Sequence, residues 1–292
     1  MQVINGKTCA AALLDELKPI ILRFQSKYHR SPRLKIIRIN DDFGSIVYTK
    51  RKIKTANLIG VEADITILPK STDEDEVLNV IKGFNHDDSI DGVIIQLPLP
   101  QHLSKDRLLD EILPEKDVDG ISRNSLGSLI RGQSTFMPCT PQGLIRLIQS
   151  INLDVKGLNV VILGQSLIVG RPAALVFLNL GATVTVCHSA TQDLEAKINT
   201  ADVLISAMGA AGVVDSKWIK PGATVLDVAI NRNASDEIIG DIDIHSCGHV
   251  GFITPVPGGV GPMTVACLQF NTVLAAIKRV KDVDLLSQLD VI

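Results

Sequence analysis

Residues 158–170 read Leu-Asn-Val-Val-Ile-Leu-Gly-Gln-Ser-Leu-Ile-Val-Gly, and this stretch decides the fold of the second half of the chain. The apolar run 158–163 predicts a buried strand of a parallel sheet, and an apolar helix is expected from about Arg171 to Leu180. A strand, a glycine turn and a helix N-terminus form a cradle for a pyrophosphate. Ser166 replaces the second glycine of the usual G-x-G-x-x-G pattern, so the motif alone is a weak signal.

The pattern of residues around this stretch strengthens the signal. Strands expected at 182–187, 202–206 and 224–228, with helices between them, predict a Rossmann-like doubly wound nucleotide-binding domain. The second strand ends in Cys187-His188-Ser189-Ala190, which has neither the acidic residue typical of NAD binding nor the basic group typical of NADP binding. His188 either contacts the ribose or caps the strand.

The first half also alternates between helix and strand. Helical periodicity at 11–28 is followed by strands at 34–39, 61–68 and 92–96 with helices between them. Proline and glycine break the chain at 137–143, where we place the domain boundary. We therefore expect a two-domain α/β fold with domains at 1–140 and 141–264, the first completed by a C-terminal helix in 265–292.

Composition limits the classes of partner. The 292 residues are 46% hydrophobic with a net charge of −3, so we expect a soluble protein with no nucleic-acid or membrane partner. The N-terminus has no apolar signal core and no apolar run approaches the roughly 18 residues of a membrane span, so we expect a cytoplasmic location. The five cysteines form no Cys-x-x-Cys pair, which favours reduced thiols without a disulfide or metal.

Two segments of the first half carry candidate chemistry. Tyr48 and Lys52 are one helical turn apart, so they share one face, and burial there would lower the pKa of Lys52 toward that of a general base. The alternative is a solvated face, because other basic residues crowd around Lys52. Gln96 ends a strand at the edge where parallel sheets bind ligands, and it is either functional or a hydrogen-bonded loop residue.

Two further motifs suggest ligand contacts. Asp117 and Asp119 precede Gly120, but they supply too few oxygens for a hard cation, which favours a turn or a polar ligand contact. The loop 253–264 contains three prolines and three glycines that bring the main chain close to a flat ligand, and Thr264 is expected to cap the helix that follows.

Six motifs, in order, resemble the bifunctional methylenetetrahydrofolate dehydrogenase and methenyltetrahydrofolate cyclohydrolase family over nearly the whole chain. They are Ser45-x-x-Tyr48-x-x-x-Lys52, residues 93–100, 116–120 and 138–143, Gly164-x-Ser166-x-x-Val169-Gly170, and 253–264. The resemblance implies oxidation of 5,10-methylenetetrahydrofolate by hydride transfer to NADP, with NAD possible. It also implies hydrolysis of the methenyl product to 10-formyltetrahydrofolate in the same cleft, by a cytoplasmic homodimer that serves one-carbon metabolism and purine biosynthesis.

The resemblance also implies roles for individual residues. Tyr48 would stack on the folate, Lys52 would handle the proton or polarise the substrate, Gln96 would hold Lys52, and Asp119 would bind the pterin amine edge. Further substrate contacts would come from Ser45, Pro98, Pro257, Gly258 and Gly259. Cofactor contacts would come from Gly164, Gln165, Ser166, Val169, Gly170, His188, Ser189, Ala207, Gly209 and Ile230.

The chain departs from the family pattern on the cofactor side. Gln165, Ser189 and Ala190 stand where the family usually has basic residues that meet the 2′-phosphate of NADP. Two alternatives to the bifunctional enzyme follow: a cyclohydrolase with weak or NAD-dependent dehydrogenase activity, and a non-catalytic folate- or nucleotide-binding protein.

Overall fold

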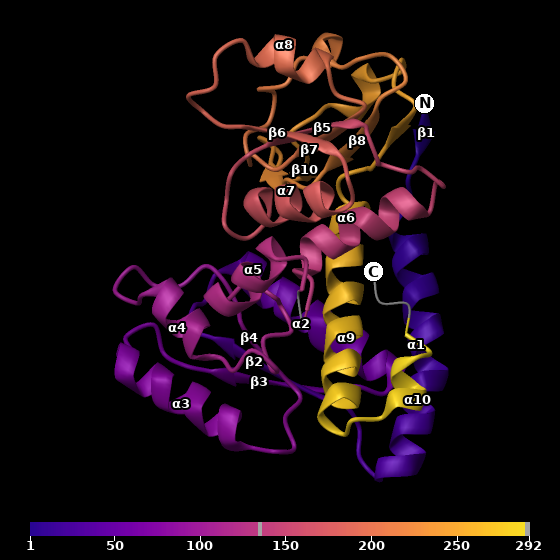
Figure 1. The fold of residues 1–292 in the computed structure, drawn as a ribbon. Helices are drawn as coiled ribbons and strands as arrows, with labels where there is room; N and C mark the ends of the chain where they lie inside the picture. Colours follow the sequence, from indigo (N-terminus) through magenta and orange to yellow (C-terminus); the bar gives the residue numbers. More distant parts are fainter. Residues whose placement is uncertain (134–135, 290–292) are drawn as a thin grey trace. The chain divides into compact units, whose positions relative to one another are not determined.

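The computed structural model of the protein describes residues 1–133 and 136–289 and separates into two compact units (Figure 1). The three-stranded unit comprises Ala11–Cys139 and Val265–Ile292, and the six-stranded unit comprises Met1–Ala10 and Thr140–Thr264. The expected α/β class with two domains is confirmed. Residues 1–10, expected in the first domain, instead belong to the six-stranded unit because β1 (Gln2–Val3) pairs with β11 (Phe252–Ile253).

The three-stranded unit is built on a parallel sheet in the order β3-β2-β4. Its strands are β2 (Arg33–Arg38), β3 (Glu62–Ile67) and β4 (Gly92–Ile95). Ile37 of the central strand β2 and Ile39 just after it pack in one apolar cluster with two helices. Val77 of α3 (Glu74–His86) and Leu108 of α4 (Lys105–Glu111) belong to the same cluster. These two helices therefore cover one face of the sheet (Figure 1).

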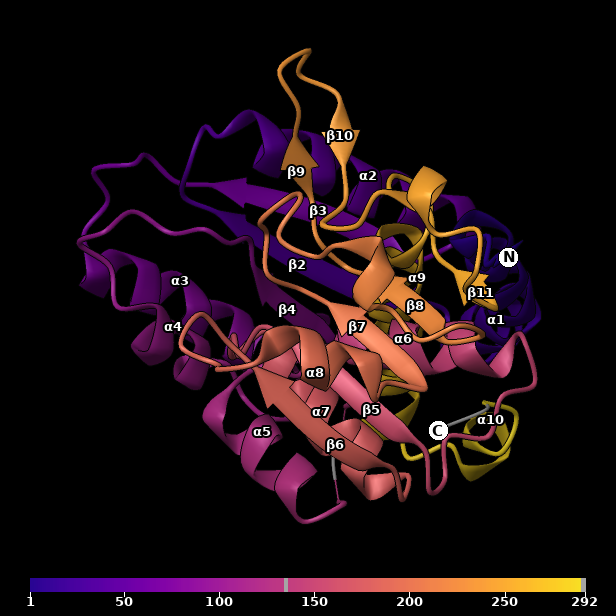
Figure 2. The same ribbon diagram turned by 90° about the horizontal axis from the view of Figure 1, so that it is seen from above.

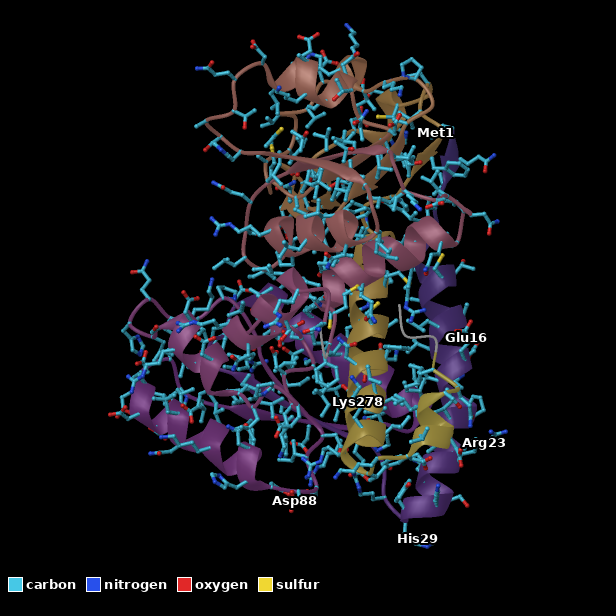
Figure 3. All side chains as sticks on the ribbon, in the orientation of Figure 1. Met1, Glu16, Arg23, His29, Asp88 and Lys278 are labelled. Atoms are coloured by element: carbon cyan, nitrogen blue, oxygen red, sulfur yellow. The ribbon has the colours of Figure 1, made fainter. Side chains whose placement is uncertain are left out.

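The remaining helices of this unit include two long ones that run side by side, α1 (Gly6–Tyr28) and α9 (Val260–Arg279) (Figure 1). The others are α2 (Phe43–Ile59), α5 (Arg123–Ile130) and α10 (Val283–Leu286). Arg23 of α1, labelled in Figure 3, donates a 2.8 Å hydrogen bond to Gln288 just after α10. The C-terminal segment thus packs on the first domain, as expected.

Helix α9 is the element whose composition most resembles a membrane span. It is the one helix in the described part of the chain with sufficient length and hydropathy, contrary to our expectation that no apolar run approaches that length. However, 89% of the apolar window is buried inside the protein. Its apolar character therefore follows from burial in the core.

The six-stranded unit has a fully parallel sheet in the order β1-β11-β8-β7-β5-β6. The inner strands β5 (Asn159–Leu163), β7 (Val203–Ser206) and β8 (Thr224–Asp227) are nearly continuous apolar runs, as expected for strands covered on both faces, and β6 is Thr183–Cys187. Helices α7 (Gly170–Asn179) and α8 (Leu194–Asn199) lie on opposite sides of this sheet (Figure 1).

Smaller elements complete the unit. The antiparallel hairpin of β9 (Asn231–Arg232) and β10 (Ile238–Ile239) stands out from the unit (Figure 2). Helix α6 spans Cys139–Gln149, and single 3₁₀ turns occur at Ser216–Trp218 and Ile244–Ser246.

Candidate active site

Lys52 is the centre of the site in the three-stranded unit. Helix α2 begins after Asp42, whose carboxylate accepts the Ser45 N–H at 2.8 Å and caps the helix. Lys52 lies on the buried face of α2, with its Nζ 5.0 Å from the centroid of the Tyr48 ring and 3.1 Å from Gln96 Oε1. The structure therefore brings together Tyr48, Lys52 and Gln96, and the solvated-face alternative for Lys52 is wrong.

Burial changes the acid–base behaviour of Lys52. Desolvation lowers its pKa, and the attraction of Asp119 and Cys139 opposes this only in part. The partner Gln96 is a neutral amide, which accepts a hydrogen bond but supplies no full negative charge to stabilise the ammonium form. Lys52 is thus poised to exist as a neutral amine nearer physiological pH than an ordinary lysine.

Gln96 is oriented by its own second hydrogen bond. It follows the last residue of β4, its backbone N–H continues the ladder to Ile37 O at 2.8 Å, and its Nε2 donates to Leu97 O at 2.8 Å. Because the amide nitrogen is used by this carbonyl, the amide oxygen faces Lys52. The sequence left two alternatives for Gln96, a functional residue or a hydrogen-bonded loop residue. Both descriptions apply, since Gln96 is held by its own hydrogen bonds and also contacts Lys52.

The acidic pair at 117 and 119 divides into two functions. Asp117 is buried and accepts Gly120 N–H at 3.1 Å, Ser122 N–H at 2.9 Å and Ser125 Oγ–H at 2.6 Å, which makes it the structural residue of the turn. Asp119 is the available carboxylate. Burial raises its pKa and the attraction of Lys52 lowers it, so the two side chains are electrostatic neighbours.

The segment that carries Asp119 is held by a residue of α9. Asn271 is fully buried and its Nδ2 donates to Val118 O at 2.8 Å and to Met137 O at 2.9 Å. Cys139 donates to the same Val118 carbonyl at 3.3 Å, and burial raises the pKa of its thiol well above the usual range. The thiol is therefore protonated and serves this segment as a donor.

The remaining expected substrate contacts of this unit lie close to Gln96. Ser45 Oγ donates to Leu97 O at 3.4 Å, and Asn40 Nδ2 donates to Pro98 O at 2.6 Å. These bonds tie the loop after β2 and the first turn of α2 to the loop after β4. Ser45 and Pro98 therefore belong to the same edge of the sheet as the Lys52 cluster.

The strand, turn and helix expected at 158–180 are present in the six-stranded unit. A Cβ on Gly164 would lie 2.5 Å from Ala207 O, and one on Gly170 would lie 2.0 Å from Gly164 O, so only glycine fits at either position. Ser166 Oγ accepts the N–H groups of Val169 at 3.1 Å and Gly170 at 3.4 Å and thereby caps α7. Serine here supplies a cap, whereas glycine in the usual pattern supplies only space.

The turn after β6 carries no basic side chain. His188 Nδ1 accepts the Ala190 N–H at 3.2 Å, and the His188 N–H donates to Thr191 Oγ1 at 2.8 Å. His188 therefore caps the end of the strand, with its Nδ1 occupied as an acceptor. His188, Ser189 and Ala190 are exposed, as is Gln165 in the glycine turn.

The buried carboxylate of Asp241 joins several loops at the carboxyl end of this sheet. Asp241 accepts four hydrogen bonds, from Ser206 Oγ at 2.8 Å, Met208 N–H at 2.9 Å, Ala210 N–H at 2.7 Å and Asn231 Nδ2 at 3.0 Å. The loop after β7, which contains Ala207 and Gly209, and the start of the hairpin that follows Ile230 are thereby joined. Ile230 is 64% exposed.

These loops and the glycine turn fit a dinucleotide. The main chain at Gly164 approaches Ala207 so closely that a side chain would fill the space, and the N-terminus of α7 faces the same turn. In open parallel sheets, this carboxyl edge is where nucleotides bind. The described residues contain no group of three or more His, Cys, Asp or Glu arranged to hold a metal ion.

The proline-glycine loop also belongs to the six-stranded unit. Gly258 has a φ of 113°, and its carbonyl accepts the Lys7 N–H at 3.2 Å. A Cβ on Gly259 would lie 2.6 Å from Pro255 O. Pro257, Gly258 and Gly259 thus form a tightly packed loop that leads into α9, which begins at Val260, and the expected helix cap at Thr264 is wrong because Thr264 already lies inside the helix.

Sequence reasoning missed Asp241 and Asn271. Asn271 left a signal, since it lies with Gln269 and Thr272 in an otherwise apolar helix, where a buried amide needs a partner. Asp241 left a weaker one, an acidic residue between Gly240 and an apolar Ile242.

Comparison with known proteins identifies the family. Residues 4–119 match the model of the tetrahydrofolate dehydrogenase/cyclohydrolase catalytic domain, and residues 138–280 match that of its NAD(P)-binding domain. The bifunctional protein FolD of Methylorubrum extorquens is 45% identical over 279 residues, which cover 94% of this chain and 91% of that protein.

Solved structures agree. The bifunctional FolD methylenetetrahydrofolate dehydrogenase/cyclohydrolase of Campylobacter jejuni is 40% identical with a TM-score of 0.93, covering 96% of this chain and 99% of that one. The Trypanosoma brucei enzyme, solved with NADP cofactor and inhibitor, is 32% identical with a TM-score of 0.92 and covers 96% of this chain and 98% of its own. This chain belongs to the tetrahydrofolate dehydrogenase/cyclohydrolase family.

Proposed function

We propose that this protein oxidises 5,10-methylenetetrahydrofolate to the methenyl compound with a nicotinamide dinucleotide and hydrolyses that product to 10-formyltetrahydrofolate. One observation carries the proposal: a buried lysine with a lowered pKa, held by a glutamine amide and close to a carboxylate. A protein that only binds folate gains nothing from a lysine in that state. The non-catalytic alternative is therefore disfavoured.

In the hydrolysis, Lys52 would move the protons. Water adds to the methenyl carbon and must lose a proton, which the neutral Lys52 Nζ can accept. The resulting ammonium can return that proton to N5 as the bond between N5 and the carbon breaks. The hydroxyl on that carbon becomes the formyl C=O and loses its remaining proton to solvent, so that one proton is released overall. Gln96 holds Nζ in place during both steps, because its amide oxygen accepts a hydrogen bond from either form of the lysine.

Substrate position would come from groups around Lys52. The half-buried Tyr48 ring offers a flat surface for the folate, and Asp119 offers acceptor oxygens to the amine edge of the pterin. Ser45 and Pro98 lie at the same sheet edge. No residue needs to act as an acid or base for hydride transfer, so the protein contributes orientation to that step.

For the cofactor, we propose NADP, with NAD as the alternative that the neutral turn favours. When bound, the dinucleotide supplies the hydride acceptor. Gly164, Gln165, Ser166, Val169 and Gly170 would hold its diphosphate, and the turn at His188 and Ser189 would meet the adenosine ribose. The absence of a basic side chain in that turn supports the second reading of the function, a cyclohydrolase whose dehydrogenase step is weak or NAD-dependent.

One assay tests the proposal. Purified protein with methylenetetrahydrofolate and either NAD or NADP should produce the methenyl absorbance and then its decay. Absence of turnover with both cofactors would overturn the proposal, and hydrolysis of added methenyl compound alone would select the second reading. Lys52→Met should slow hydrolysis by about 10²–10⁴-fold while hydride transfer continues, because only hydrolysis needs a proton carrier.

We also propose a homodimer, supported by an apolar surface on the three-stranded unit. Leu58 of α2 is 66% exposed and Ile67 of β3 is 54% exposed, and β3 is an edge strand. Exposed apolar residues beside an unpaired edge strand are typical of association surfaces. Light scattering should give a mass of two chains, and Leu58→Glu should reduce it to one.

A further inference from the structure

Among the residues that the structure describes, Arg38 is a buried cation whose guanidinium has no hydrogen-bond or ion-pair partner. It is 8% exposed, its Nε is buried without a hydrogen bond, and its guanidinium forms no ion pair with any residue that the structure describes. Desolvating a charge that has no compensating partner is unfavourable. Such a residue calls for an anion that the protein itself does not provide.

Two other cations of the same unit, the buried Lys116 and the partly exposed Arg30, are paired. Lys116 donates to the carbonyls of Phe84 at 2.7 Å, Asn85 at 2.9 Å and Asp87 at 2.7 Å. Arg30 forms two hydrogen bonds with the buried Asp91, at 2.7 and 2.9 Å. Arg38 differs from both.

The register of the sheet places Arg38 beside Gln96. Ile37 pairs with Ile95 in the parallel ladder, and the Gln96 N–H continues it to Ile37 O at 2.8 Å, so Arg38 and Gln96 are the next neighbours along the two strands. Neighbouring parallel strands are about 4.8 Å apart.

Alternation along the strands sets the face on which Arg38 lies. Ile37, Ile39 and Ile95 belong to the apolar cluster on the α3 and α4 side of the sheet. Successive residues of a strand point to opposite faces, so Arg38 and Gln96 share the other face. Gln96 contacts Lys52 from that face, which places Arg38 at the same carboxyl edge as the Lys52 cluster.

We propose that Arg38 binds a carboxylate of the glutamate portion of the folate substrate. The inference rests on the proposed function, which supplies a substrate whose anionic groups are its glutamate carboxylates. The methenyl bridge is cationic and would be repelled by a guanidinium, whereas a carboxylate matches its planar donors.

The test compares two substrates that differ only in the glutamate. Wild-type protein should show a KM for methylenetetrahydrofolate about 10-fold below that for the methylenetetrahydropteroate analogue, because a hydrogen bond to a charged group is lost with the glutamate. Arg38→Gln should raise the KM for the folate by about 10-fold, leave that for the pteroate analogue unchanged and keep kcat. Arg33→Gln, at the other end of β2, is the control and should leave the KM values for both substrates unchanged.

Each outcome decides the assignment. Equal wild-type KM values for the two substrates would overturn it without need of any variant, as would an equal effect of Arg38→Gln on both. If inorganic phosphate raised the melting temperature of the wild type but not of Arg38→Gln while the KM values stayed equal, Arg38 would hold a free anion and the carboxylate assignment would be wrong. Failure of the proposed function is distinct, since neither substrate would then be turned over.

Discussion

Replacement of Asp241 by asparagine is the most stringent test of how the nucleotide loops are held. The Oδ2 atom of Asp241 accepts Ser206 Oγ–H and Met208 N–H, and Oδ1 accepts Ala210 N–H and Asn231 Nδ2–H. An asparagine retains one acceptor oxygen. The hydroxyl and the amide among these partners can rotate to adapt, but the two backbone N–H groups cannot.

Either orientation of the new amide therefore leaves one partly buried backbone N–H, of Met208 or Ala210, facing an NH₂ group. An unpaired buried donor costs about 1–3 kcal/mol, and hydrogen bonds to the carboxylate charge are lost in addition. One effect opposes this loss: burial, and in smaller part the charge of Asp241, raises the pKa of Asp227, so removal of that charge relieves some repulsion between the two carboxylates. We expect a net loss of about 2 kcal/mol.

Urea unfolding and nucleotide binding together measure the effect. With a slope of about 2 kcal/mol per M urea, the midpoint for the six-stranded unit should fall by about 1 M. The Kd for NADP or NAD should rise, while hydrolysis of added methenyltetrahydrofolate stays near the wild-type rate, because the groups that perform it lie in the other unit. Asp243→Asn is the matched control, since asparagine caps the 3₁₀ turn at Ile244 as well as aspartate does. Unchanged midpoint and Kd in Asp241→Asn would refute the reasoning.

Four further substitutions test the energetics of buried polar groups. Lys52→Met should stabilise the protein by about 1 kcal/mol or more, and by more at pH 6 than at pH 10. The reason is that burial lowers the pKa of Lys52 in the folded state, so the stability of the wild type falls as the pH drops from the unfolded-state pKa to the folded-state pKa. An equal gain at both pH values in thermal melts would contradict this. Asn271→Leu should cost about 1–3 kcal/mol, because it removes both hydrogen bonds donated by Nδ2 and leaves the Met137 carbonyl without this donor, while Val118 O still accepts the Cys139 thiol. Gln269→Leu on the same helix should raise stability, since neither polar atom of Gln269 has a partner in the described structure. Chemical denaturation that ranked the two variants in the reverse order would exclude the explanation. Burial raises the pKa of Asp227 from 3.8 to about 6. Its contribution to the free energy of unfolding is therefore complete below about pH 4 and is lost as the pH rises through 6, a decline of about 3 kcal/mol. Asp227→Asn should remove this decline from the pH profile of unfolding.

Local patterns predicted the parts of the fold that depend on neighbours in sequence. The apolar run at 158–163 encodes the strand directly, and the glycines at 164 and 170 encode the turn. Only glycine fits at position 164, because a Cβ there would lie 2.5 Å from Ala207 O. The one-turn spacing of Tyr48 and Lys52 likewise placed both on one face of α2.

Features that depend on distant contacts were not predictable in the same way. Residues 2 and 3 are too few to signal a strand, and they form one only because β11 offers an unpaired edge. The packed loop at Gly258 and Gly259 sets the start of α9 at Val260. Because no capping residue marks this start, the sequence pattern wrongly predicted a cap at Thr264. Asp241 gains its role from partners 10 to 35 residues away, a relation that no local pattern expresses.

The two faces of the three-stranded sheet differ in a way that explains where the chemistry lies. The face under α3 and α4 is lined by apolar side chains in one close cluster, which supplies stability but no reactive group. The opposite face, at its carboxyl edge, carries Arg38, Lys52 and Gln96, where burial lowers the pKa of Lys52 and leaves Arg38 unpaired. Charged groups that are desolvated without full compensation gain most from a ligand that completes them. The apolar face supplies the stability that offsets the cost of these charges in the unliganded protein. A substrate with a carboxylate for Arg38 and a hydrolysable carbon for Lys52 would therefore bind at this edge with a favourable free energy.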